Sequence, residues 1–416
     1  MEQQNISRVT YIDDFNHEIK NINLNDDKLN SFFYFDWLIY INNYEDLRIA
    51  NINTYPKALN HWQLYGKNEK RTFIKITDSV KKNKNIFIIT NNKGGGSIKY
   101  LDDIINHYKN VDFIYIKNKN DLYRQKYNVN DILFIQHLLF TDITIVEIIE
   151  IKLTFGLKIY ISIHDFYWLN DVILYTFPSD YCIHNNYLKD NININTDILK
   201  LFELADIIIH PSKFTFDIYS KYFNDINFKI VHHNDYLINQ NIINVQKISK
   251  NMINIGVLHT YSICKGSQYI EMLRCKYKTY NSYNINWCII GETIPPNNET
   301  EFFDYIKKYN IHCLTYLNKW GETWCYSLTK GINSGLPIIY NNFGSFKERI
   351  PHNKENIFMV YNNENNSDDC EQLYTTFIKI LDYIILNNKE NLNKKDNIPN
   401  TDLTIQYNDF YNNIFC

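Results

Sequence analysis

The residues best suited to chemistry lie in the C-terminal half, where a carboxylate and a flexible turn follow two successive apolar strands. The runs 311–317 and 337–340 are predicted strands, and Glu322 and Gly344 come shortly after them. Because the carboxyl ends of parallel strands meet at one edge of an open α/β sheet, we expect both residues to face one ligand. A carboxylate there can grip two sugar hydroxyls. Ser345 is predicted to cap the next helix, whose first N–H groups can hold phosphate oxygens.

A second candidate is the run Gly94-Gly95-Gly96, which joins the predicted strand 85–90 to the predicted helix 98–108. The chain has only 12 glycines among 416 residues, so three in a row mark a place where bulk is excluded. A strand, a glycine turn and a helix start form a cradle for a phosphate or a sugar. A plain tight turn is the alternative interpretation.

Polar pairs follow two further strands of the N-terminal half. His164 and Asp165 come directly after the predicted strand 157–163, and His137 follows the strand 132–135. These positions place the side chains at the carboxyl edge of a sheet, where a cleft histidine could contact a ligand. The alternative is that His164 caps local backbone; for Asp165 we expect the start of a turn. His137 is a further candidate for the same edge.

The composition excludes several classes of protein. The net charge is −3 and no long basic run is present, which gives no argument for nucleic-acid binding. The N-terminus lacks the apolar core of a secretion signal, and the apolar runs are too short to predict a transmembrane segment. Eight cysteines are scattered without a C-x-x-C pair, which predicts free thiols in a reduced, cytoplasmic protein.

The pattern of strands and helices predicts an α/β chain of four parts. Residues 1–78 form a helical module with a disordered start, and residues 79–245 and 246–400 form two Rossmann-like domains. Residues 401–416 form a last helix. Within the second domain, a helix at 323–333 should end at Gly335, because glycine adopts the left-handed conformation without strain.

The segment WGETWCYSLTKGINSGLPIIYNNFGSFKERI resembles the donor-site segment of retaining GT-B glycosyltransferases of a family 4-like type. The motif is roughly W-x-E-T-W-x-Y-x-L-x-E, then G-L-P, then G-x-x-x-E-R. The matching residues are Glu322, Thr323, Trp324, Tyr326, Leu328, Gly335, Leu336, Pro337, Gly344, Glu348 and Arg349. The resemblance implies the GT-B fold, in which two Rossmann-like domains face a cleft and the last helix packs back on the first of them.

The same resemblance implies an activity and its residues. A sugar would pass from a nucleotide-diphosphate sugar to a glycan or glycoprotein acceptor, without a cofactor or a catalytic metal. Lys265, in a Lys-Gly pair at a helix start, would hold the donor diphosphate, and Glu322 would hold sugar hydroxyls. His164 would lie near sugar and acceptor, and the glycine run would face the cleft. The sugar, the nucleotide and the oligomeric state are left open.

The chain departs from the family at two positions. The second glutamate of the motif, which commonly contacts the nucleotide ribose, is replaced by Lys330, and an arginine is replaced by Thr260. The donor domain is also shortened. A degenerate GT-B relative that binds a sugar or a partner without turnover is therefore the alternative. A GT-B enzyme of another class, such as a sugar-nucleotide epimerase, is a third reading, against which the E-T-W segment speaks.

The segment 31–71 resembles a small helical module found beside glycosyltransferase domains, often in large DNA viruses. Its motif, roughly F-D-W-x-x-Y followed later by H-W-x-x-x-G, includes Trp37 and Trp62. We expect these tryptophans to form the module's core, and a sugar-stacking platform is the alternative. A viral origin would place the protein in the host cytoplasm.

Overall fold

The structure is a computed structural model. It describes residues 11–12, 18–19, 35, 37–71, 84–90, 96–129, 131–139, 141–169, 194–233, 247–292, 299–350, 355–360, 370–390 and 401–415. The chain forms two compact units. The first comprises Met1–Asn85, Tyr123–Ile132 and Ile143–Lys158, and the second Ile86–Leu122, Leu133–Asp142 and Ile159–Cys416. This division differs from the expected domains 1–78, 79–245, 246–400 and 401–416, whose boundaries stay predictions.

The N-terminal module is a small helical bundle with an aromatic core. A pair of two-residue antiparallel strands, β1 (Tyr11–Ile12) and β2 (Glu18–Ile19), precedes it. Its helices are α1 (Trp37–Asn43), α2 (Glu45–Ile49), α3 (Tyr55–His61) and the π-helix η1 (Trp62–Gly66). Trp62 is 4% exposed and packs against Phe35, while Trp37 is partly buried beside them. The expected helices are confirmed, and both tryptophans belong to the core.

The first sheet has six strands in the order β4-β3-β5-β6-β7-β8. They are β3 (Ile86–Ile89), β4 (Phe113–Ile116), β5 (Ile132–Ile135), β6 (Lys158–Ser162), β7 (Ile207–His210) and β8 (Phe228–Ile230). The associated helices are α4 (Gly96–His107), α5 (Lys119–Arg124), α6 (Ile145–Phe155), α7 (Thr196–Leu204) and α8 (Lys213–Tyr219). Strands β3 and β5 are buried along their whole length, which explains their uninterrupted apolar sequences.

Local signals in the sequence determine where these helices begin and end. A capping box joins Thr144 and Glu147 at the start of α6, and Gly156 ends that helix in the left-handed conformation. Ser212 caps α8, because its Oγ accepts a hydrogen bond from the N–H of Thr215 at 3.3 Å. Ser212 is therefore the N-cap of α8.

The second sheet also has six strands, in the order β10-β11-β9-β12-β13-β14, with only the β10–β11 pair antiparallel. They are β9 (Met252–Val257), β10 (Thr279–Tyr280), β11 (Tyr283–Ile289), β12 (Ile311–Tyr316), β13 (Ile338–Tyr340) and β14 (Ile357–Met359). The helices are α9 (Ser267–Lys276), η4 (Ile290–Glu292), α10 (Glu299–Lys308), α11 (Tyr326–Ser334), α12 (Phe346–Arg349) and α13 (Cys370–Glu390). Gly335 follows α11 in the left-handed conformation, as predicted.

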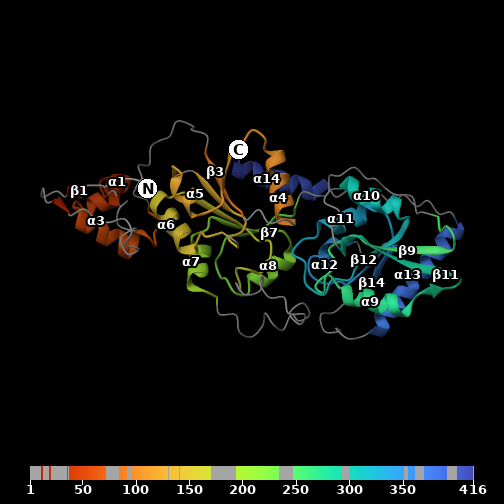
Figure 1. Cartoon of the computed structure of the whole chain (residues 1–416). Coiled ribbons are helices and arrows are strands. Elements are labelled where there is room, and N and C mark those ends of the chain that lie inside the picture. The colour runs from red at the N-terminus through yellow and green to blue at the C-terminus, as the bar shows by residue number, and fades with distance from the viewer. Residues whose placement is uncertain are drawn as a thin grey trace, which may run out of the picture. The chain divides into compact units, whose positions relative to one another are not determined.

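Helices cover both faces of this second sheet. On one face α9 and α13 pack on β9 through residues such as Ile270 and Phe377. On the other face α10 and α11 pack on β12 and β13 through residues such as Phe302 and Leu328. Figure 1 shows α10 and α11 on one side of the strands and α9 and α13 on the other. We call this sheet with α9 to α13 the second lobe, and the first sheet with α4, α7 and α8 the first lobe.

The last helix, α14 (Thr401–Phe415), lies beside α4 of the first lobe (Figure 1). The hydroxyls of Tyr411 and Tyr100 share a hydrogen bond between the two helices. The ring of Phe415 packs against Tyr108, which directly follows α4, and Phe113 on β4. The chain therefore returns to the first lobe after it has built the second.

The cysteines differ in part from the expected free thiols. Cys275, Cys288, Cys313, Cys325 and Cys370 are free, but Cys264 is disulfide-bonded, so the prediction is wrong at that position. The spacing of the cysteines in the sequence does not reveal which of them form a disulfide. Of the helices that the structure describes, none has both the length and the apolar character needed to cross a bilayer.

Candidate active site

The centre of the site is an ion pair between Lys265 and Glu322. Gly266 begins α9 with φ of +81°, and a Cβ on it would lie 1.9 Å from the carbonyl oxygen of Leu317. Only glycine therefore allows α9 to start against the end of β12. This close approach places Lys265 beside the loop that follows β12, where its ammonium donates a hydrogen bond to Glu322 Oε1. The resemblance implied that both residues hold the donor, and the structure brings them together.

The carboxylate of Glu322 is held by amide groups as well as by the ammonium. Its Oε1 also accepts from Asn318 Nδ2, and Asn341 Nδ2 donates to the carbonyl oxygen of Asn318 at 3.1 Å. Glu322 is only 4% exposed, whereas the Lys265 side chain is 24% exposed, so the carboxylate is buried and the ammonium is partly accessible to water. Burial, the largest single effect, would lower the pKa of Lys265, but the charge of Glu322, the nearby Cys325 and the hydrogen bond to Glu322 together raise this pKa. Lys265 is therefore a cation at neutral pH.

The loop after β13 supports the backbone of Glu322. Gly344 has φ of +69°, and a Cβ there would lie 2.5 Å from the backbone nitrogen of Glu322. The N–H of Ser345 donates to the carbonyl oxygen of Glu322 at 2.9 Å. The predicted approach of these two loops is confirmed.

The predicted capping role of Ser345 is wrong. Its backbone is already helical, with φ of −63° and ψ of −12°, whereas a capping serine usually has an extended backbone. Its Oγ is buried and has no hydrogen-bond partner among the residues that the structure describes. Helix α12 is four residues long, so few N–H groups are available at its start to hold a phosphate.

His164 lies just beyond the end of β6 and faces the second lobe. Its carbonyl oxygen accepts from Thr323 Oγ1 at 2.7 Å, a contact that joins the two lobes. Its ring lies 5.1 Å from the ring of Tyr100, and its buried Nε2 has no partner within the described ranges. Burial and, secondly, the nearby His137 lower the pKa of His164 to about 3, against the opposing effect of Asp165. The imidazole is therefore neutral at physiological pH.

His137 and Asp165 build the turn that carries His164. The N–H of Leu139 donates to His137 Nδ1 at 3.0 Å, so the proton resides on Nε2, which lies 2.8 Å from Asp165 Oδ2. Asp165 Oδ1 accepts from the N–H of Tyr167 at 2.9 Å, which confirms the predicted turn. Burial, the largest single effect, would raise the pKa of Asp165, but the hydrogen bond and charge of His137, the N–H of Tyr167 and the nearby His164 together hold this pKa below its ordinary value.

Sequence reasoning missed a cluster of rings between the lobes. His233, just beyond β8, stacks on Tyr100 with ring centroids 4.4 Å apart and on Tyr326 with centroids 5.3 Å apart. Trp324 lies 5.2 Å from the same imidazole. Burial, first of all, lowers the pKa of His233 well below its ordinary value. These rings come from three separate segments, so no local spacing could have revealed the cluster.

Only one of the three predicted cradle glycines can be placed. Gly94 and Gly95 lie outside the described residues, while Gly96 is the first residue of α4. A Cβ on Gly96 would lie 3.5 Å from the ring of Tyr326, which is ordinary van der Waals contact. Lys99, one turn further along α4, places its ammonium 5.3 Å from the same ring. The start of α4 therefore faces the second lobe.

Lys330, at the position of the expected second glutamate, is buried in α11. Its side chain is 5% exposed and its ammonium lies 5.8 Å from the ring of Phe302 on α10. In the described part of the chain, no three His, Cys, Asp or Glu side chains converge as metal ligands would.

Comparison with known proteins identifies the fold. No family model and no curated protein sequence matches the chain. Sucrose-phosphate synthase from Thermosynechococcus elongatus matches with a TM-score of 0.52 and 10% identity over 80% of this chain and 99% of that one. HepE from Anabaena, in complex with UDP and glucose, matches with a TM-score of 0.47 and 11% identity over 80% of this chain and 99% of that one. The catalytic domain of starch synthase IV from Arabidopsis thaliana, bound to ADP and acarbose, matches with a TM-score of 0.44 and 9% identity over 79% of this chain and 99% of that one. The chain has the GT-B fold, and the predicted fold class is confirmed.

Proposed function

We propose that the protein is a retaining, family 4-like glycosyltransferase that moves a sugar from a nucleotide-diphosphate sugar to a glycan or protein acceptor. The observation that carries the proposal is the pairing of Lys265 with Glu322 at the carboxyl edge of the second sheet. One group of this pair suits a diphosphate, the other suits sugar hydroxyls, and the GT-B fold supports the assignment.

Lys265 would neutralise the charge that develops on the leaving diphosphate. Its cationic state is secured by Glu322 before any ligand arrives, so no proton has to be taken up during binding. Preorganised charge of this kind stabilises a transition state without reorganisation at the moment of reaction. The donor diphosphate would compete with Glu322 for the ammonium.

Glu322 would hold hydroxyls of the transferred sugar. Its carboxylate is oriented by Asn318, and its backbone is fixed by the turn at Gly344. Fixed orientation lowers the entropy that must be lost on the way to the transition state. In a same-face transfer the leaving phosphate helps to accept the acceptor's proton, so the protein needs no second carboxylate as a nucleophile.

His164 would line the sugar and acceptor side. Its neutral imidazole has a buried Nε2 without a partner in the described residues, and a hydroxyl of the bound ligand would satisfy that nitrogen. The glycine run at Gly94, Gly95 and Gly96 remains a proposed cleft wall, for which the position of Gly96 beside Tyr326 is the support.

A binding protein without turnover is the second candidate, and Lys330 is the observation that favours it. A buried ammonium stands where the family uses a carboxylate toward the ribose, so the donor would meet a different charge. This candidate shares the binding site with the first but predicts no loss of sugar from the donor.

Two measurements test the proposal. Calorimetric titration with UDP, ADP, GDP and dTDP, each alone and as its glucose conjugate, should show binding that Lys265→Met weakens by tenfold or more. Lys276→Met, at the other end of α9, is the matched control. Release of free nucleotide diphosphate from the donor then distinguishes a transferase from a binding protein. Absence of binding by every nucleotide would refute both candidates.

A further inference from the structure

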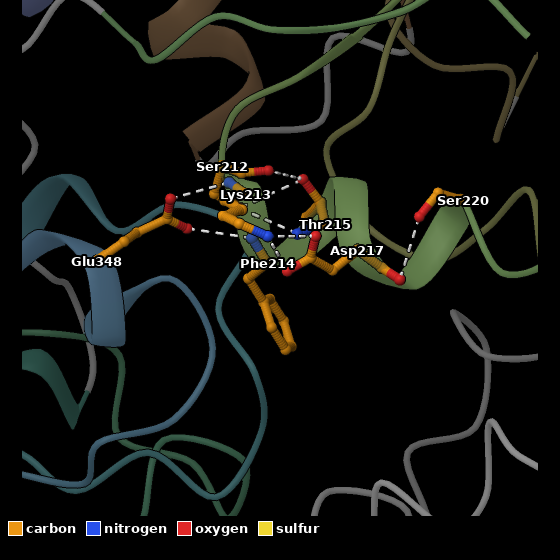
Figure 2. Close-up of polar contacts among 7 residues, drawn as sticks. All are labelled: Ser212, Lys213, Phe214, Thr215, Asp217, Ser220 and Glu348. Atoms are coloured by element: carbon orange, nitrogen blue, oxygen red, sulfur yellow. Dashed lines mark hydrogen bonds and ion pairs between the residues drawn. The ribbon is translucent and has the colours of Figure 1, made fainter.

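The cap of helix α8 in the first lobe is completed by the second lobe (Figure 2). The first N–H groups of a helix have no partner within the helix. Ser212 provides one acceptor, for the N–H of Thr215. Glu348 of the second lobe provides the others: its Oε2 accepts from the N–H of Lys213 at 2.9 Å, and its Oε1 accepts from the N–H of Phe214 at 3.2 Å. Both carboxylate oxygens thus bind the opposite lobe.

The residue after Glu348, Arg349, contacts the second lobe itself. Arg349 places its guanidinium 3.7 Å from the ring of Trp324 and donates to the carbonyl oxygen of Cys325 at 2.9 Å. Its other nitrogen donates to Thr329 Oγ1. Trp324 and Cys325 belong to the segment that carries Glu322, so α12 connects the proposed donor site to the first lobe.

Apolar packing surrounds this contact. Phe214, whose N–H binds Glu348, rests on Gly321, where a Cβ would lie 2.3 Å from its ring. The same ring lies 5.8 Å from that of Phe343. Gly321 directly precedes Glu322, so the first lobe touches the loop that holds the proposed sugar-binding carboxylate.

We infer that Glu348 is a positioning residue for the transfer reaction, whose carboxylate clamps the second lobe onto α8 and so holds the donor site closed. The inference rests on the proposed function for its catalytic consequence, but the clamp itself is an observed contact. When the lobes separate, the N–H groups of Lys213 and Phe214 are hydrated, and each forms its hydrogen bond to Glu348 again when the lobes close. Glu348 acts through this closure and not through contact with the donor.

The geometry allows the clamp to be removed from either side. Glu348→Ala removes the acceptor. Lys213→Pro removes one donor, and proline is well tolerated as the first residue of a helix. The extended backbone of Ser212, with φ of −150° and ψ of 157°, is compatible with a following proline. Asp217→Ala is the matched control, because it breaks the ion pair of the Lys213 side chain and leaves both N–H groups in place.

The experiment measures the distance between the lobes in the full chain. Spin labels are placed on the exposed Cys275 of α9 and on a cysteine introduced at Lys200 of α7, with Cys370 replaced by serine. Glu348→Ala should lower the ratio of closed to open molecules about fivefold, the size expected for the loss of an exposed helix cap. Lys213→Pro should lower this ratio by a smaller factor. The double variant, Glu348→Ala with Lys213→Pro, should have a ratio no lower than that of Glu348→Ala alone. Asp217→Ala should change it less than twofold.

Kinetics provide the second readout. UDP, ADP, GDP or dTDP should bind Glu348→Ala with an affinity within twofold of the wild type, since the donor site lies on the second lobe. The kcat should fall about fivefold without a matching rise in the KM for the donor. An unchanged distance distribution in Glu348→Ala would overturn the inference. It would also be overturned if the double variant lowered the ratio of closed to open molecules by the product of the factors for Glu348→Ala and Lys213→Pro, since the two residues would then act independently. If the wild type bound no nucleotide, the proposed function would fail while the distance result would still decide the clamp.

Discussion

Replacing Lys265 with methionine should destabilise the protein more than any substitution of an ordinary surface lysine. Methionine keeps the length of the side chain and removes its charge. Among the residues that the structure describes, Asn318 then remains as the side-chain donor to the buried Glu322 carboxylate. Removing one partner of a buried ion pair costs about 3–5 kcal/mol. The Lys265 side chain is 24% exposed, so water screens the pair in part and we expect about 2–3 kcal/mol.

A double variant distinguishes the effect of the unpaired Glu322 charge from the effect of the changed side-chain shape at position 265. In Lys265→Met combined with Glu322→Gln the uncompensated carboxylate is gone, and Asn318 can still donate to the glutamine oxygen. We therefore expect the double variant to be more stable than Lys265→Met, within about 1 kcal/mol of the wild type. The recovery would appear as a coupling energy between the two sites.

Thermal unfolding in low salt measures these differences. For a cooperative unit of this size, 1 kcal/mol shifts Tm by about 2–4 °C, so Lys265→Met should lower Tm by roughly 5–10 °C. Lys276→Met, which removes an exposed ammonium 3.3 Å from the ring centroid of Tyr374, should shift it by less than about 2 °C. A Tm for Lys265→Met equal to that of the wild type, or a double variant less stable than Lys265→Met, would refute the reasoning.

Three further predictions follow from the same contacts. Gly344→Ala should lower stability by at least about 1–2 kcal/mol in thermal unfolding, because φ is +69° and the new Cβ would meet the backbone of Glu322. Glu322→Gln should bind free nucleotide diphosphate several-fold more tightly by calorimetry while transfer slows, since Lys265 loses its competing partner. The closed form should become less stable relative to the open form as the pH falls below about 6.5. The pKa values of His164 and His233 are lowered in the closed form, so the closed form binds fewer protons than the open form. Its stability relative to the open form is therefore complete only above the ordinary histidine pKa. The closed fraction at pH 5.0 and 7.5 checks this sign.

Much of the fold could be predicted because its strands are buried on both faces. The sequences of β3 and β5 are uninterrupted apolar runs, and such runs have few other stable locations in an α/β chain. Strand β4 was missed; it lies at the sheet's edge, where its residues are less buried than those of β3 and β5 and Tyr115 is exposed. The meeting of Glu322 and Gly344 was predictable from topology alone, since both follow neighbouring parallel strands.

The contacts between the lobes could not be predicted in the same way. Glu348 and Lys213 are 135 residues apart, and neither is unusual for an exposed helix residue. His233 could not be linked to the site from the sequence, because its neighbours Tyr100 and Tyr326 lie on helices distant from it along the chain. Ser345 was misassigned for the opposite reason: the local pattern suits a cap, but the turn at Gly344 gives Ser345 a helical backbone.

The ion pair also explains why the proposed donor site needs residues of both charges on one edge. An ammonium as enclosed as that of Lys265 is stable only beside an anion, and Glu322 supplies one in the absence of ligand. Under the proposed function an arriving diphosphate would replace Glu322 at the ammonium and free the carboxylate for sugar hydroxyls. The free energy of binding then depends on both exchanges. Nucleotide alone would satisfy Lys265 but leave the Glu322 carboxylate without its cationic partner, with the hydrogen bond from Asn318 retained. The glucose conjugate should therefore bind more tightly than the nucleotide, and this preference should vanish in Glu322→Gln.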